Sequence, residues 1–153
     1  MDVLQTAAPY LKIPTLLLNR SSRFEQPNVP VQDGLTQLSA GIKRRLLGRY
    51  GQQVLSLYHL IHHDPALAQK IGTTDTLWAE LVLACQAEHV VHLDDLLLRR
   101  TRIALLLEQG AQAQMPRIKM ICQENLGWDD NTWCAEQERF EHIMKQHYSL
   151  PEC

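Results

Sequence analysis

Residues 73–109 form the longest stretch of this chain without a helix breaker, and they limit most strongly what it can fold into. The stretch contains neither glycine nor proline, and its apolar residues recur at steps of three and four. That spacing puts them on one face of an α-helix and not on alternate sides of a strand. The stretch forms one long helix or two. Because aspartate favours the start of a helix, residues 92–95 (His-Leu-Asp-Asp) are the natural place for a break.

The same spacing predicts helices on both sides of this stretch. Leu35, Leu38, Ile42 and Leu46 form one stripe, and Gly51 separates that helix from a second one in the sequence QQVLSLYHLI. No segment shows the two-residue alternation of a strand. We therefore predict an all-α fold, a compact helical domain of about five to six helices.

Cap residues predict where the other helices begin and end. Asp64 before Pro65 is the pairing expected of an N-cap and a first helical residue, and this short turn of helix ends at Gly72. Pro116 begins a helix of about residues 115–126, which Gly127 closes. Residue 129 or 130, both aspartates, caps a last helix that runs to about residue 147.

The N-terminal residues differ from the rest in composition. Pro9, Pro14, Pro27 and Pro30 exclude long helices, so we expect residues 1–33 to be an extended Pro-rich arm or linker. Residues 34–148 would form the helical domain, and residues 149–153 a tail.

Composition and charge exclude several functions. The 153 residues carry a net charge of -2, without the basic excess of a nucleic-acid-binding domain. No apolar run approaches the roughly 20 residues that span a bilayer, and the N-terminus lacks the basic start of a signal peptide. We expect a cytoplasmic protein, with membrane contact only peripheral and through a partner.

The motifs of common active sites are missing. No two of the four cysteines are spaced as CxxC, and there is no GxSxG or glycine-rich phosphate loop. His89 and His92 could share a helix face with Glu88, and further candidate metal ligands lie at His59, His62, His63 and Asp64. Neither group has the spacing of a complete site. We therefore expect no metal, no cofactor and no catalytic residue in this chain.

The charged residues around the expected break suggest a structural role. Counted along the two stripes, Glu88 and Arg100 both fall on apolar faces, so we expect them to be buried and paired. Asp95 and Arg99 fall on another face, at the favourable i,i+4 spacing, together with Arg102. A phosphate site in the arginine cluster is the alternative.

Three blocks of this chain resemble a known family. The blocks are YGQQVLSL, LWAELVLACQAEHVVHLDDLLLRRTRIALLL and PRIKMICQENLGWDD. They resemble the C-terminal domain of FAD-dependent glycerol-3-phosphate dehydrogenases and the related alpha-glycerophosphate oxidases, over roughly residues 44–143. The matching positions are Tyr50, Gly51, Glu80, Glu88, Asp95, Leu97, Arg99, Arg100, Thr101, Arg102, Pro116, Leu126, Gly127, Trp128 and Asp129. His92 stands where the family usually has the capping residue Thr or Ser, so Asp94 or Asp95 would carry more of that role.

The resemblance implies an accessory domain without catalytic residues. Its parent would oxidise sn-glycerol 3-phosphate to dihydroxyacetone phosphate with FAD, which the N-terminal FAD and substrate domain of the parent would bind. Nothing in residues 1–43 resembles that domain, so we expect a domain separated from its parent, inactive alone. A homodimer is a further partner to consider. The alternative function is a free-standing helical module that binds an acidic or phosphorylated partner through Arg99, Arg102 and the basic face of residues 43–49.

Overall fold

The computed structural model describes residues 38–148, and in this part of the chain every named element is helical. The predicted all-α class is confirmed. The longer helices are α2 (Ala40–Tyr50), α3 (Val54–His63), α4 (Trp78–Ala87), α6 (Met115–Leu126) and α7 (Asp130–His147). Shorter pieces are η3 (Gly51–Gln53), η4 (Pro65–Ala68), η5 (Asp95–Arg100), α5 (Ile103–Leu106) and η6 (Glu108–Gln114). The predicted arm, residues 1–33, and the tail, residues 149–153, lie outside the described residues, as does Leu35.

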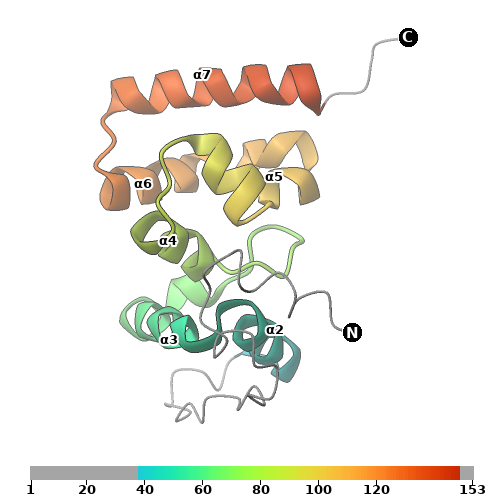
Figure 1. The fold of residues 1–153 in the computed structure, drawn as a ribbon, viewed down its shortest axis with the longest axis vertical. Helices are drawn as coiled ribbons and strands as arrows, with labels where there is room; N and C mark the ends of the chain where they lie inside the picture. The colour runs from blue at the N-terminus through green and yellow to red at the C-terminus, as the bar shows by residue number, and fades with distance from the viewer. Residues whose placement is uncertain (1–37, 149–153) are drawn as a thin grey trace, which may run out of the picture.

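Helix α4 occupies the middle of the structure (Figure 1). Helices α2 and α3 lie on one side of it, α5 and α6 lie on the other, and α7 lies beyond them at the far end. Residues from Trp78 to Cys85 of α4 are all buried, so most of this helix is enclosed on every side. A helix that is buried all round packs in the centre of a domain, and the others form layers against it.

The predicted caps are confirmed. Asp64 accepts a hydrogen bond from Ala66 N, and Asp129 accepts one from Thr132 N at 2.7 Å, so each satisfies a free N–H at the start of a helix. The piece after Asp64 is shorter than predicted and ends at Ala68. Gly127 follows α6 with a φ of 69°, a left-handed conformation that costs glycine little.

The long stretch without glycine or proline divides where predicted. Helix α4 ends at Ala87, and the next helical residue is Leu93. Asp95 accepts a hydrogen bond at 3.1 Å from the backbone N–H of His92, which precedes the helix, whereas the first helical N–H, that of Leu93, donates to Glu136 of α7. From Asp95 the helix widens into a π-helical turn, in which Thr101 N donates to Leu96 O, five residues back.

Residues with a left-handed backbone conformation follow the π-helical turn and recur in the segment that leads to α6. Arg102 has a φ of 59°, and Gln109, Gly110 and Ala111 follow with φ values of 50°, 67° and 68°. Gly110 packs against α7, since a Cβ there would lie 3.2 Å from Met144 Cε. Side chains of α7 thus close over the 109–111 turn, and Phe140 of the same helix is buried there.

Candidate functional site

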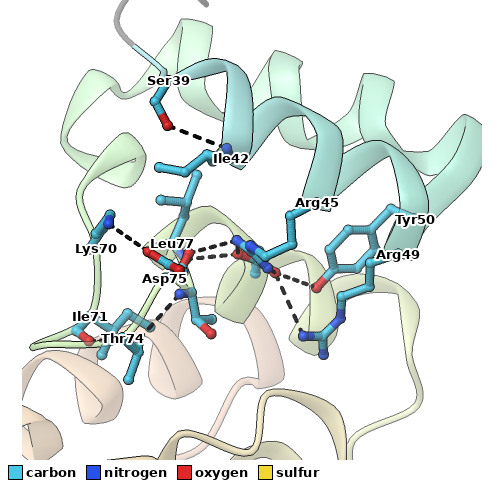
Figure 2. A network of polar contacts seen from close by, with 12 residues as sticks. Ser39, Ile42, Arg45, Arg49, Tyr50, Lys70, Ile71, Thr74, Asp75 and Leu77 are labelled. Atoms are coloured by element: carbon cyan, nitrogen blue, oxygen red, sulfur yellow. Dashed lines mark hydrogen bonds and ion pairs between the residues drawn. The ribbon is translucent and has the colours of Figure 1, made fainter.

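Glu80, in the first turn of α4, is the centre of a buried polar network. Its side chain has no exposure to water, although the surrounding residues of α4 are apolar. Arg45 donates to both carboxylate oxygens, and its Nη1 lies 3.0 Å from Oε2. The Tyr50 hydroxyl donates to Oε2 at 3.0 Å, and Leu77 N donates to Oε1 at 2.8 Å. Figure 2 shows Arg45, Arg49 and Tyr50 extending from α2 towards this point.

The network joins three segments of the chain. Arg45 Nη2 also donates to the carbonyl oxygen of Asp75, in the loop that precedes α4, at 2.7 Å. Arg49 Nη1 lies 3.9 Å from Glu80 Oε2, and Arg49 Nη2 donates to the carbonyl oxygen of Arg100. Glu80 and these two arginines therefore connect α2, the 70–77 loop and the arginine-rich end of η5.

The electrostatics follow from these contacts. The hydrogen bond to Glu80 raises the pKa of Arg45 above its ordinary value, against the opposing effect of burial. Burial, followed by the negative charge of Glu80, raises the pKa of Tyr50 far above that of a free phenol. Donors from this chain surround both carboxylate oxygens, so Glu80 holds α2 and the 70–77 loop against α4.

A second network attaches α7 to the helix that begins at Leu93. Asp94 is buried and receives a hydrogen bond from Arg139 of α7. Glu136, three residues earlier on α7, lies 2.9 Å from His92 Nδ1 and accepts from Leu93 N at 3.0 Å. A carboxylate from another helix thus satisfies one of the N–H groups that have no partner within their own helix at this helix start.

Asp95 and Arg99 form the predicted i,i+4 ion pair, at 3.0 Å, and Arg99 Nη2 also lies 3.7 Å from Asp94. Arg99 is therefore partly neutralised by this chain. So are Arg45 and Arg49, on the 43–49 face that we considered for an acidic partner. Arg102, the other arginine of that hypothesis, is exposed.

The predicted pairing of Glu88 with Arg100 is wrong. Glu88 follows the last residue of α4 and is half-buried, whereas Arg100 is exposed. The prediction counted 3.6 residues per turn along both stripes. In η5 the i→i+5 hydrogen bonds put more residues in each turn, so Arg100 leaves the face of Leu93 and Leu97, which are fully buried. The buried glutamate of α4 is Glu80 and not Glu88.

Sequence reasoning did not identify Arg45, Asp94, Glu136 and Arg139 as members of these networks. Glu136 carried a usable signal, because Trp133, Glu136 and Phe140 follow one another at steps of three and four, and both aromatic residues are buried. No sequence signal pointed to Arg45, because its partner Glu80 is 35 residues away. Trp128, which we named from the resemblance, is half-buried, and its ring centroid lies 6.4 Å from that of Trp133.

The histidine and cysteine side chains are dispersed over the described residues. In residues 38–148 no group of three or more histidine, cysteine, aspartate or glutamate side chains is arranged to hold a metal ion. His89 is exposed with a φ of 52°, and His92 contacts Glu136. Cys85 and Cys122 are buried, and a hydrogen bond between them, with burial, raises the pKa of Cys122.

Among the described residues, no helix has both the length and the apolar character that a membrane span requires.

Comparison with known proteins agrees with the sequence blocks described above. Residues 16–133 match the family described as the C-terminal domain of alpha-glycerophosphate oxidase. This range begins before the 44–143 region of resemblance and ends within α7. Comparisons with curated proteins and with solved structures gave no match. Because the matched range covers most of the chain, the chain belongs to the family of C-terminal domains of alpha-glycerophosphate oxidases.

Proposed function

We propose that this chain is the non-catalytic accessory domain of an FAD-dependent enzyme that oxidises sn-glycerol 3-phosphate to dihydroxyacetone phosphate. The observation that carries the proposal is the family match over residues 16–133. The domain would pack against the FAD and substrate domain of its parent and stabilise it. It would reach a membrane only through that parent, from the cytoplasm.

The helical content of the described residues supports the proposal that this chain does not itself hold the flavin dinucleotide. Dinucleotide folds hold the pyrophosphate on a glycine-rich turn between a strand and a helix, and the elements of residues 38–148 are helices. The most buried acid, Glu80, is enclosed by donors of this chain. In this proposal the redox chemistry belongs entirely to the parent domain, and the two polar networks keep the accessory domain rigid enough to dock.

A binding experiment tests the proposal. The flavin-containing part of an alpha-glycerophosphate oxidase would be produced without its own C-terminal domain, and its bound flavin checked by absorbance. We expect this chain to bind it, to raise its melting temperature and to slow its loss of flavin. The control is an unrelated flavin dehydrogenase. Failure to bind the oxidase, or equal binding to the control, would contradict the proposal.

A second measurement tests the non-catalytic role. With added FAD and a dye acceptor, the chain alone should not oxidise glycerol 3-phosphate. Stoichiometric binding of FAD at micromolar concentration by the chain alone would contradict this part of the proposal.

A further inference from the structure

Two adjacent leucines on α5 are exposed although their neighbours are core residues. Ile103 and Ala104 are 0% and 3% exposed, whereas Leu105 and Leu106 are 50% and 63% exposed. The other large exposed apolar side chains of the described residues stand singly, and they are Leu55, Val91, Met120 and Tyr148. Single exposed apolar residues are ordinary, but grouped ones often mark an interface.

Two exposed arginines without a carboxylate partner precede these leucines in the chain. Most other basic side chains of the described residues have carboxylate partners, as Arg45 does with Glu80 and Arg139 does with Asp94. Within residues 38–148, the guanidinium groups of Arg100 and Arg102 have no such partner and both residues are exposed, as is also true of Arg44 on α2. The carbonyl of Arg102 accepts a hydrogen bond from Leu105 N, so the backbones of the charged and the apolar residue meet in the same turn.

The backbone in this turn is held in an unfavourable shape. Arg102 has φ 59° and ψ 16°, a left-handed conformation that is strained for a residue with a Cβ. Contacts on the preceding residues fix it, because the buried Thr101 hydroxyl donates to Leu96 O and Arg49 donates to the carbonyl of Arg100. A glycine would adopt this conformation without strain, so the arginine is present against the preference of the backbone. Such strain points to a use of the side chain.

We propose that Arg100, Arg102, Leu105 and Leu106, here the arginine–leucine surface, dock against the FAD and substrate domain of the parent enzyme. This inference rests on the proposed function. The partner would offer an apolar area to the leucines and carboxylates to the arginines, because the positive charge of this surface is not neutralised by the described residues. The family to which the chain belongs consists of C-terminal domains of a larger enzyme, so one face of the domain meets the rest of that enzyme.

The decisive variant is Arg102→Gly, because a structural role and a binding role predict different effects on the affinity for the parent domain. Glycine relieves the strain at φ 59°, so the melting temperature should stay the same or rise. Affinity for the flavin-containing part of the oxidase should nevertheless fall. A structural role alone would leave the affinity unchanged.

Two double variants extend the test to both halves of the surface. R100E/R102E and L105Q/L106Q should each weaken binding by about tenfold or more. The matched controls are R44E on α2 and M120Q on α6, which alter an exposed arginine and an exposed apolar residue elsewhere. Each should bind within about twofold of the unaltered chain.

The outcomes separate the two proposals. If the unaltered chain binds but the arginine–leucine variants bind equally well, the surface is assigned wrongly and the proposed function stands. If binding is lost in the controls and not in these variants, docking uses another face. If the unaltered chain does not bind, both proposals are wrong.

Discussion

Glu80 shows how one buried charge can organise several helices. Its carboxylate has no exposure to water, which is costly unless each oxygen is paired and hydrogen-bonded. Arg45 supplies a two-pronged contact, and Tyr50 and Leu77 supply the remaining donors. Guanidinium suits this position because its planar fork matches both carboxylate oxygens at once.

Removal of this charge should therefore destabilise the domain. We expect Glu80→Gln to lower the free energy of unfolding by about 2–4 kcal/mol, somewhat less than for a fully enclosed pair because the Arg45 side chain keeps 28% exposure. Glu88→Gln is the matched control and should change it by less than about 1 kcal/mol. Urea titration of both variants measures the difference. Equal losses would mean that Glu80 is not the centre of the network.

The raised pKa of Tyr50 makes a prediction for alkaline solution. In the unfolded chain this phenol loses its proton near pH 10.0, whereas in the folded chain it stays protonated well above that. The unfolded state thus binds fewer protons, so this contribution to stability is complete below pH 10.0 and is lost as pH rises further. Tyr50→Phe should make stability depend less on pH above this value. A stability profile measured by urea titration from pH 8 to 11 would reveal an unchanged slope if the prediction is wrong.

At the scale of elements, α7 packs against a part of the chain that lies far from it in the sequence. Trp133 and Phe140 supply the buried apolar contacts, and Glu136 and Arg139 lie between them. Glu136 acts as a cap for a helix other than its own. This arrangement couples the position of α7 to the start of the helix at Leu93.

Loss of the Glu136 carboxylate should weaken this attachment. Glu136→Ala leaves Leu93 N–H without its partner, so we expect a loss of about 1–3 kcal/mol in the free energy of unfolding. Glu138→Ala, an exposed glutamate on the same helix, should cost less than about 0.5 kcal/mol. Hydrogen exchange of the Leu93 amide should accelerate only in the first variant. Acceleration in both would indicate general fraying of α7.

At the scale of the whole molecule, the reactivity of the thiols indicates how readily the packed helices separate. Cys85 and Cys122 lie in the core between α4 and α6, whereas Cys134 is exposed on α7. Burial and the raised pKa of Cys122 both disfavour the reactive thiolate. A thiol can then react only when the surrounding helices separate.

Among the three cysteines of the described residues, we therefore expect alkylation of the native protein to modify Cys134 first. Cys85 and Cys122 should react only in denaturant, with each site read by peptide mass spectrometry. Modification of Cys122 at the rate of Cys134 under native conditions would show that the α4–α6 contact opens readily.

Local sequence signals predicted much of the fold. The break before Leu93, the caps Asp64 and Asp129, and the closing Gly127 were all predictable because each depends on a residue and its near neighbours. The apolar spacing was sufficient for the helical class, and the R-R-T-R and L-G-W-D blocks were sufficient to indicate the family. These features need no knowledge of which helices meet.

Only the tertiary structure decided the partners of the buried charges. Helical periodicity indicates which face a residue occupies, but not which helix lies opposite, so Arg45 could not be assigned to Glu80 across 35 residues. The π-helical turn rotated Arg100 off the stripe on which regular geometry had placed it. Arg100 at the end of this turn and Arg102 directly after it are exposed, because its i→i+5 hydrogen bonds change the direction of the side chains.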